Sequence, residues 1–208
     1  MASKLKRCWN SVNPLYVKYH DEEWGVPVHD DRTLFEFLTL EGFQAGLTWE
    51  LILKRREALR KAFDNFIPEK ITRYSDEDVK RLMANPDVIR NRAKILAAIN
   101  NAVRLGEVQK EFGSFDAFVW KFVQGKTLND ALTDFSKMPA ETEESKMMSK
   151  EMKKRGFKFV GPTICYAFMQ AVGLVNDHLI DCFRYDEIKN MASEKPARAK
   201  MRRDIARP

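Results

Sequence analysis

Residues 153–182, KKRGFKFVGPTICYAFMQAVGLVNDHLIDC, constrain the fold more than any other stretch of the chain. A helix ending in KKR is predicted to stop at Gly156, and Gly161-Pro162 is predicted to open a second, apolar helix that ends at Gly173. Two helices joined by so short a turn form a helix-hairpin-helix. The glycine and proline pattern alone favours an ordinary antiparallel helix pair, and the other motifs of the chain are what favour the helix-hairpin-helix.

The start of the second helix has the chemistry of a phosphate site. Gly161 has no side chain and Pro162 already has a helical φ, so the first amides of the helix can approach an anion closely. The surrounding positive charge comes from Lys153, Lys154, Arg155 and Lys158. The hairpin is therefore predicted to contact a nucleic-acid backbone.

Residue types that bind metals follow directly on the hairpin. Asn176 or Asp177 is predicted to cap a third helix, which would place His178 and Cys182 four residues apart on one face. Most H-x-x-x-C pairs are core residues, so this pair alone is weak evidence for a metal site.

The beginning of the chain offers matching residues. Cys8 and His20, together with the pair near the other end, complete a Cys2His2 set suited to tetrahedral zinc. His29 and Cys165 are alternative ligands. With three cysteines in the chain, reduced thiols or metal ligands are expected rather than a disulfide framework.

Length and charge set the broad class. The 208 residues suffice for one sizeable domain or two small lobes, and the net charge of +6 suits a polyanionic partner without requiring one. The chain has no apolar run of membrane-spanning length, and MASKLKRCW lacks the apolar core of a signal peptide, so a cytoplasmic protein is expected.

Aromatic residues crowd the N-terminal segment without a helical period. Trp9, Tyr16, Tyr19 and Trp24 are separated by turn-forming residues. An irregular segment that packs its rings against a helical body would explain them, and so would a pocket with aromatic walls.

Glu41 stands out in the next segment. Residues 31–63 have apolar residues at helical spacing, interrupted between Gly42 and Gly46, which predicts two helices joined at a kink or tight turn. A carboxylate among apolar neighbours at this junction is costly to bury without a purpose or a partner. A helix cap or a salt bridge is the alternative role.

The remainder is predicted to be helical, which makes the chain all-α. The next segment is predicted to form a short helix, a break at Asn85-Pro86 and a longer helix. Arg90, Arg92 and Lys94 form a basic cluster near the start of the longer helix. This cluster is predicted either to contact a DNA backbone or to be solvated. Residues 124–142 are expected to form a polar loop. Residues 184–208 are expected to form a basic tail or frayed helix outside a single helical domain of residues 1–183.

Five motifs together resemble the DNA-3-methyladenine glycosylase I family of the helix-hairpin-helix DNA glycosylases. The motifs read NPLYVKYHDEEWGVP, LEGFQAGLTW, PDVIRNRAKILAAINNA, KKRGFKFVGPTICYAFMQAVGLVNDH and the DC that follows, and the match as a whole extends from about Cys8 to about Cys182. The resemblance implies a two-lobed helical fold with the hairpin at about residues 145–173. It also implies a structural zinc that joins the two ends of the domain through Cys8, His20, His178 and Cys182.

The resemblance also implies roles for residues around a lesion pocket. Glu41 matches the carboxylate that recognises the base, Trp49 the ring on which the base stacks and Tyr19 a hydrogen-bonding wall, with Trp9, Tyr16 and Trp24 as further aromatics. Leu47 matches the residue that enters the duplex. Lys158, Gly161 and Thr163 of the hairpin are expected to contact DNA.

The implied reaction is hydrolysis of the N-glycosidic bond of 3-methyladenine in double-stranded alkylated DNA, with release of the free base. Relatives with lyase activity carry a lysine just after the second glycine of the hairpin, where this chain has Pro162-Thr163, so the reaction should stop at the abasic site. Asp177 and Asp181 are expected to cap a helix or support the zinc site. The protein is expected to act as a monomer, and the competing hypothesis is a non-catalytic module that recognises damaged DNA.

Overall fold

The computed structural model describes residues 5–193, which are mostly helical. The α-helices follow one another as α1 Pro14–Glu22, α2 Asp31–Gln44, α3 Trp49–Ala62, α4 Pro68–Ile71, α5 Asp76–Ala84, α6 Arg92–Phe112, α7 Phe115–Trp120, α8 Glu143–Lys154, α9 Pro162–Ala171 and α10 Phe183–Ser193. Short 3-10 turns lie at Asp64–Phe66, Lys121–Val123 and Phe135–Lys137. Within this part of the chain, no helix has both the length and the apolar character needed to cross a membrane.

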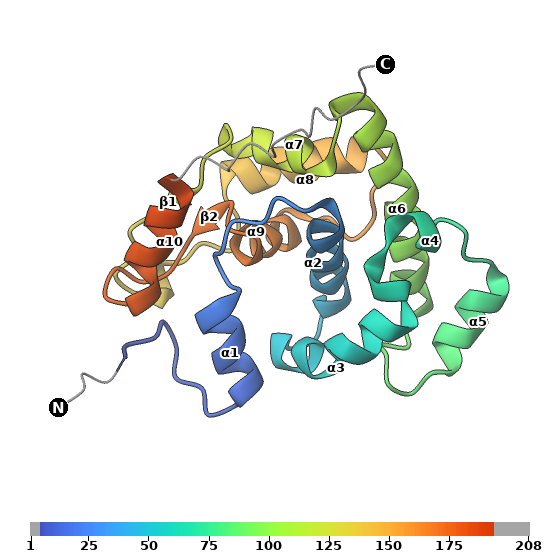
Figure 1. Ribbon diagram of the computed structural model, residues 1–208, viewed down its shortest axis with the longest axis horizontal. Coiled ribbons are helices and arrows are strands. Elements are labelled where there is room, and N and C mark those ends of the chain that lie inside the picture. Colours follow the sequence, from blue (N-terminus) through green and yellow to red (C-terminus); the bar gives the residue numbers. More distant parts are fainter. Residues whose placement is uncertain (1–4, 194–208) are drawn as a thin grey trace, which may run out of the picture.

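Helix α2 forms the centre of the molecule (Figure 1). Its residues 34–43, LFEFLTLEGF, are all buried, as expected for a helix whose apolar residues surround the axis. It packs against α3, α6, α7 and α9. In the view of Figure 1, α3 lies below α2 and α4 to α6 lie to its right, α9 and α10 lie to its left, and α8 lies above it. Side chains on every face of α2 are therefore covered by other elements.

The predicted interruption after α2 is a tight connection of residues 45–48. Thr48 caps α3 by accepting a hydrogen bond from the Leu51 amide, and the positive φ of Gly46 turns the chain. Lys94 is buried here, and its Nζ donates to the carbonyl oxygens of Phe43 and Ala45 at the end of α2. It is therefore neither solvated nor available to DNA, unlike its exposed neighbours in the predicted basic cluster.

The predicted hairpin consists of α8, a turn of residues 155–161 and α9, and the two helices pack against each other. Gly156 has a φ of 84°, and Gly161 is the N-cap residue of α9. Asn101 of α6 binds both backbone polar groups of Lys158 in the turn, because its Oδ1 accepts from the Lys158 amide and its Nδ2 donates to the Lys158 carbonyl. The turn is thus fixed to the helical body.

The prediction of an all-α chain holds except for one small parallel pair of strands, β1 Leu128–Asn129 and β2 Val175–Asn176. Strand β2 follows Gly173, whose φ is 75°. A Cβ at Gly173 would lie 2.5 Å from the backbone of Val26 and Pro27. Only glycine allows the N-terminal segment to approach the end of α9 so closely.

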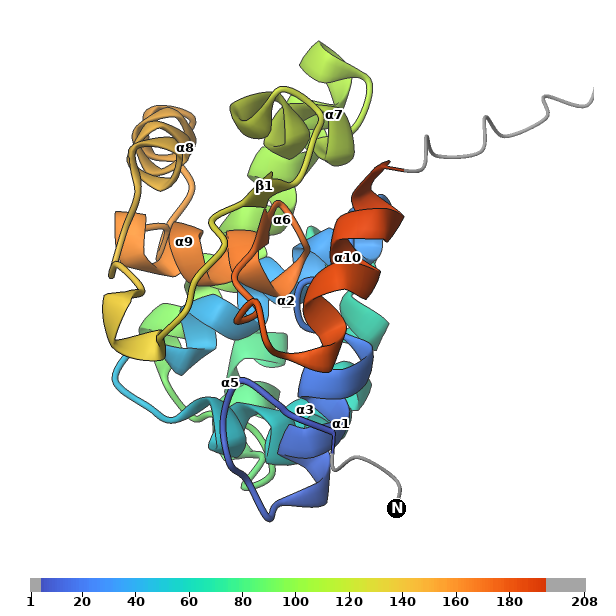
Figure 2. The same ribbon diagram turned by 90° about the vertical axis from the view of Figure 1, so that its left-hand side faces the viewer.

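Residues 184–193 form most of α10, whereas the sequence predicted a basic tail or frayed helix from residue 184, outside the helical domain. The helix packs on the body because Ile188 is fully buried and Arg184 and Tyr185 are nearly so. In both Figure 1 and Figure 2, α10 lies near α1, which comes from the other end of the described chain. The rest of the predicted tail lies outside the described residues, and the predicted division into two lobes stays a prediction.

Candidate active site and metal centre

A cavity of about 320 Å³ opens beside α2, a size within the usual range for small-ligand sites. Helices α1, α2, α3 and α9 and the segment around the turn Phe135–Lys137 contribute its walls. All of the side chains that the resemblance placed in a lesion pocket line this one cavity, namely Trp9, Tyr16, Tyr19, Trp24, Glu41 and Trp49.

Glu41 supplies the carboxylate of the cavity. Glu41 is only 4% exposed, and burial raises the pKa of its carboxyl group to about 8. Tyr19 and Trp49 lie beside each other with ring centroids 5.3 Å apart, and burial followed by the charge of Glu41 raises the Tyr19 pKa well above its usual value. The cavity therefore holds an acid that is poorly solvated when it is ionised, which favours a cationic ligand.

The raised pKa of Glu41 predicts that Glu41→Gln is more stable to unfolding than the wild type at neutral pH. The stability that the protonated Glu41 side chain contributes is fully present below its unfolded pKa of about 4.5, and it is lost as the pH rises through its folded pKa of about 8. At about 1.4 kcal/mol per pKa unit, we expect an advantage for the variant on the order of 2–4 kcal/mol at pH 8 and none at pH 4.5. Urea unfolding across this range measures the difference, and a gap that did not change with pH would contradict it.

Further aromatic rings line the cavity and, together with Tyr19 and Trp49, form an aromatic wall next to the Glu41 carboxylate. Trp9 lies 4.9 Å from Trp24, 5.2 Å from Tyr16 and 5.7 Å from Phe135 between ring centroids. Such rings present negative faces that attract cations and stack on flat bases. The cavity thus combines stacking surfaces with one buried acid.

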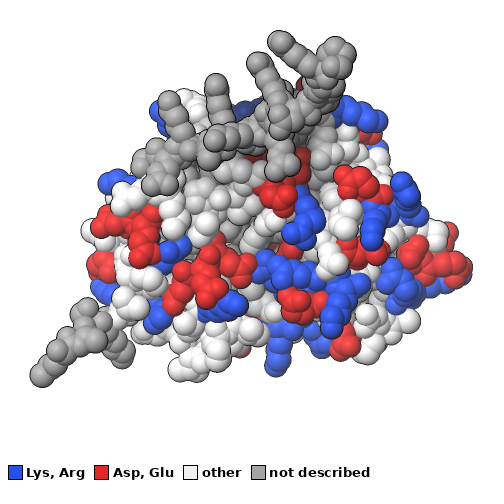
Figure 3. Space-filling view, viewed as in Figure 1, with Lys and Arg blue, Asp and Glu red and all other residues white. Residues whose placement is uncertain are grey.

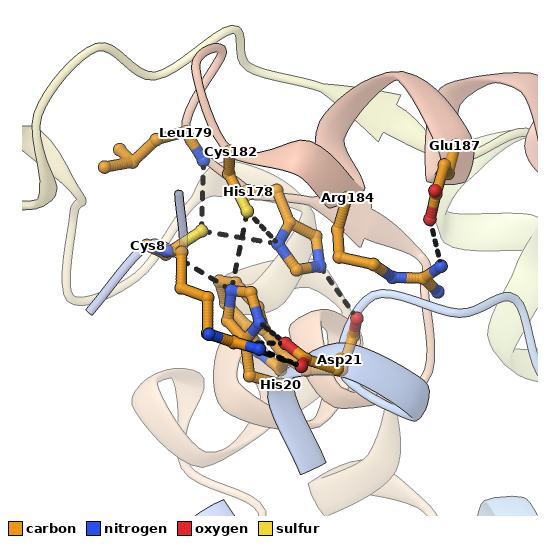
Figure 4. A network of polar contacts seen from close by, with 10 residues as sticks. Cys8, His20, Asp21, His178, Leu179, Cys182, Arg184 and Glu187 are labelled. Atoms are coloured by element: carbon orange, nitrogen blue, oxygen red, sulfur yellow. Dashed lines mark hydrogen bonds and ion pairs between the residues drawn. The ribbon is translucent and has the colours of Figure 1, made fainter. Parts of the chain in front are cut away.

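Next to this wall, four buried metal-ligand side chains meet (Figure 4). One potential ligand atom from each of Cys8, His20, His178 and Cys182 lies within 4.8 Å of all the others. The His178 Nδ1 atom is 3.3 Å from Cys8 Sγ and 3.6 Å from Cys182 Sγ, and Cys182 Sγ is 3.5 Å from His20 Nε2. Zinc bonds of roughly 2.3 Å to sulfur and 2.0–2.1 Å to nitrogen at tetrahedral angles imply sulfur–nitrogen separations of about 3.6 Å. The four side chains therefore fit a tetrahedral metal ion.

The second nitrogen of each histidine ring is also bound, as is usual for metal-ligating histidines. His20 Nδ1 lies 2.7 Å from Asp21 Oδ1, and Arg7 holds the same carboxylate. His178 Nε2 lies 2.9 Å from the Trp24 carbonyl oxygen. These contacts fix the ring orientations seen in Figure 4. The cluster is thus organised to bind a metal, and Asp21, which follows His20 directly in the sequence, is a supporting residue that the sequence analysis missed.

The two alternative ligands lie elsewhere. Cys165 is buried in α9 and donates from Sγ to the Val160 carbonyl, and His29 pairs with Asp116. The predicted third helix is wrong, because residues 177–182 form a loop and turn between β2 and α10. The backbone bends so that the Cys182 amide donates to the Leu179 carbonyl, and this turn brings His178 and Cys182 together.

Comparisons with known proteins agree with this geometry. A family model described as methyladenine glycosylase matches residues 9–185. DNA-3-methyladenine glycosylase 1 of Escherichia coli (strain K12) is 48% identical over 182 residues, covering 87% of this chain and 97% of that protein. The chain belongs to the methyladenine glycosylase family.

Solved structures of 3-methyladenine DNA glycosylase I share the fold. One superimposes with a TM-score of 0.83 at 50% identity, covering 86% of this chain and 98% of the other. A variant solved in complex with 3-methyladenine superimposes with a TM-score of 0.82 at 36% identity, covering 84% and 94%. The fold of this methyladenine glycosylase is therefore that of its relatives over nearly their whole length.

The residues predicted to contact DNA lie outside the cavity. Leu47 is 37% exposed in the connection between α2 and α3. Lys158 and Thr163 are exposed at the hairpin, and Gly161 is partly exposed at the start of α9. Their contact with DNA stays a prediction for this member of the methyladenine glycosylase family.

Sequence reasoning missed half of the cavity lining, which also includes Asn10, Gln44, Phe135, Met138, Ala167 and Gln170. Phe135 and Met138 come from the segment predicted to be a polar loop, and nothing in its pattern indicates that it folds over the cavity. Gln170 did carry a signal, because it is a polar residue near the end of the apolar helix α9.

Proposed function

We propose that this methyladenine glycosylase excises 3-methyladenine from alkylated DNA by hydrolysing the N-glycosidic bond. The observation that carries the proposal is the buried Glu41 beside Tyr19 and Trp49, in a chain that belongs to this family. Methylation at N3 makes the base cationic while it is attached to the sugar. Stacked rings and a buried carboxylate attract such a cation, and the nucleotide must leave the duplex to reach them.

The reaction needs little chemical assistance, because the cationic base is already a good leaving group. The bond between C1′ and the base breaks with its electron pair returning to the base, which leaves neutral. Water bonds to C1′ and its proton goes to solvent, so that an abasic site remains. No lysine lines the cavity among the described residues, which supports a hydrolytic reaction without a Schiff-base step.

Release of free 3-methyladenine from methylated duplex DNA tests the proposal. A protein that bound methylated DNA without releasing the base would be the non-catalytic recognition module instead. The acidic, ring-lined cavity favours the enzyme, because a protein that only bound the duplex would not require a cavity for an extruded base.

The buried Cys8, His20, His178 and Cys182 cluster supports zinc as the resident metal, since mixed thiolate and imidazole ligands in a tetrahedron suit this ion. Four protein ligands leave no position for an activated water, so the ion would be structural. A hydrogen bond with the Cys8 thiol, assisted by His178 and His20, lowers the pKa of the Cys182 thiol and favours its thiolate form. The zinc would tie the N-terminal aromatic segment to the turn before α10.

We further propose that the hairpin and Leu47 engage the duplex, as in helix-hairpin-helix glycosylases. Lys153, Lys154 and Lys158 are exposed and make no ion pair within residues 5–193, whereas Arg155 is bound by Glu111 and Glu151. The lysines are therefore free to contact phosphates. The face seen in Figure 3 intersperses basic and acidic side chains and offers no extended basic surface of its own.

Lys158→Ala is expected to weaken binding to undamaged duplex and to reduce the slope of log K against log salt by roughly 0.9, the loss of one phosphate contact. Affinity for free 3-methyladenine should not change, because phosphate contacts position the enzyme and base contacts specify the lesion. Duplex binding at several salt concentrations and free-base titration measure the two effects. Lys80→Ala, an exposed lysine of α5, is the matched control. Equal weakening of both affinities would contradict the assignment.

A further inference from the structure

Gln170 lies at the cavity on α9, which packs against α2, the helix that carries Glu41. Gln170 is 9% exposed, and most of its neighbours on α9 are apolar. A buried amide is costly unless its donors and acceptor are used. The partners of its two polar atoms therefore indicate what this side chain does in the cavity.

The amide nitrogen of Gln170 is fully engaged. Its Nε2 donates to Asp177 Oδ2 at 2.7 Å and to Met138 Sδ at 3.0 Å. Asp177 is 1% exposed and also accepts from the Tyr166 hydroxyl at 2.5 Å, so its position is fixed from a second side. Reversing the amide would place the Gln170 carbonyl oxygen against a carboxylate oxygen. The orientation of the amide is therefore locked.

The remaining polar atom, Oε1, accepts no hydrogen bond from any described residue. Because both N–H groups are used, this oxygen is the only hydrogen-bonding capacity that Gln170 has left for a ligand. Two of the residues that line the cavity thus carry acceptors, Glu41 on α2 with its carboxylate and Gln170 on α9 with a neutral oxygen whose amide is held in place.

We propose that Gln170 Oε1 is a second acceptor for the extruded base, and that it makes the cavity select an exocyclic amino group over an oxo group. This inference rests on the proposed glycosylase function. Adenine presents a 6-amino donor where guanine presents an oxygen, so 3-methylguanine would place an acceptor towards the acceptors of Glu41 and Gln170. Leaving a buried polar group unpaired, or opposing it with a like group, is the strongest basis for rejecting a similar ligand.

The alternative role for Gln170 is purely structural, as a donor that keeps Asp177 in place. Both roles predict some loss of stability when the amide is removed. Only the proposed role predicts a change in the relative rates for the two methylated purines, because a structural defect lowers both rates together.

The test uses Gln170→Met, which keeps the length of the side chain and removes the acceptor. The control is Tyr166→Phe, which removes the other donor to Asp177, and Tyr166 does not line the cavity. The rates of release of 3-methyladenine and 3-methylguanine are measured on methylated duplex DNA for the wild type and both variants. In Gln170→Met we expect the ratio of kcat/KM for 3-methyladenine to kcat/KM for 3-methylguanine to fall about tenfold or more, the effect of one buried hydrogen bond. In Tyr166→Phe the same ratio should stay within about twofold of the wild-type value.

An unchanged ratio in Gln170→Met, or an equal change in Tyr166→Phe, would overturn the inference while leaving the glycosylase function intact. If the wild type released neither base, the proposed function itself would fail. Circular dichroism checks the fold of each variant first. If the methionine variant does not fold, Gln170→Ala removes the same acceptor without adding bulk, and the same ratio decides.

Discussion

Glu41→Gln is expected to lower kcat/KM for release of 3-methyladenine from DNA about 10- to 150-fold, which corresponds to a loss of roughly 1.5–3 kcal/mol of interaction free energy. The substitution keeps the shape of the side chain and removes the negative charge that faces a cationic base. Single-turnover excision at several enzyme concentrations separates the effect on binding from the effect on the bond-breaking step.

The loss should fall mainly on binding. Positive charge leaves the base for the sugar as the bond to C1′ breaks, so the attraction of Glu41 is strongest before the reaction and does not grow in the transition state. Glu50→Gln is the matched control, since Glu50 is exposed at the start of α3 and does not line the cavity. If Glu41→Gln abolished excision at saturating enzyme with free-base affinity intact, Glu41 would instead be a catalytic base or a stabiliser of the sugar cation.

The same carboxylate predicts a pH profile. In the empty cavity Glu41 has a pKa of about 8, so below this pH most of the enzyme must release a proton before the carboxylate can pair with the cation. In the wild type, kcat/KM should therefore rise about tenfold per pH unit below pH 8 and level off above it. The profile of Glu41→Gln should be flat over this range.

Removal of the proposed zinc is expected to have the largest effect on stability. Binding of structural zinc contributes about 10–16 kcal/mol in zinc-finger peptides. A loss of only about 5 kcal/mol would lower the Tm of a chain of this size by roughly 10–20 °C. Cys182→Ala should reduce the zinc content below one ion per chain and lower the Tm by this order, as measured by elemental analysis and thermal unfolding.

Cys165→Ala is the control for that experiment, because Cys165 is a buried free thiol outside the cluster. It should keep one zinc per chain and lose only the small stability of a shortened core side chain. Full zinc content in Cys182→Ala, or no zinc in the wild type, would reject the assignment of the cluster as a zinc site.

Periodicity made the central helices predictable. The apolar spacing of residues 31–63 and the glycines between them indicate α2, the turn and α3, and the hairpin helices end within two residues of their predicted limits. The packing of α10 on the body was not predictable, since its buried face consists of Arg184, Tyr185 and Ile188 within a charged segment that predicted only a tail or a frayed helix. The β1–β2 pair was missed because two residues per strand carry no pattern, and the partner strands lie 47 residues apart in the chain.

The site residues also divide into those that the sequence predicted and those that it did not. Unusual residue types revealed Glu41, the N-terminal rings and the four candidate ligands, because a buried acid, rings without helical period and cysteine–histidine pairs all need an explanation. The contribution of Phe135 and Met138 depends on how an irregular segment lies over the cavity. Tertiary contacts of this kind leave no local signature in a sequence.

The ligand cluster joins positions that are synthesised at very different times. Cys8 and His178 lie 170 residues apart, and His20 and Cys182 lie 162 residues apart. Rings of the cavity wall lie against this cluster. The distance between ring centroids is 4.6 Å from Trp9 to His20 and 4.6 Å from Trp24 to His178. A chain that emerges from the ribosome N-terminus first must hold these tryptophans unassembled until almost the whole domain has been made. Every nascent intermediate before that point lacks a completed base cavity, so the ability to sever a base from DNA arises only at the end of synthesis.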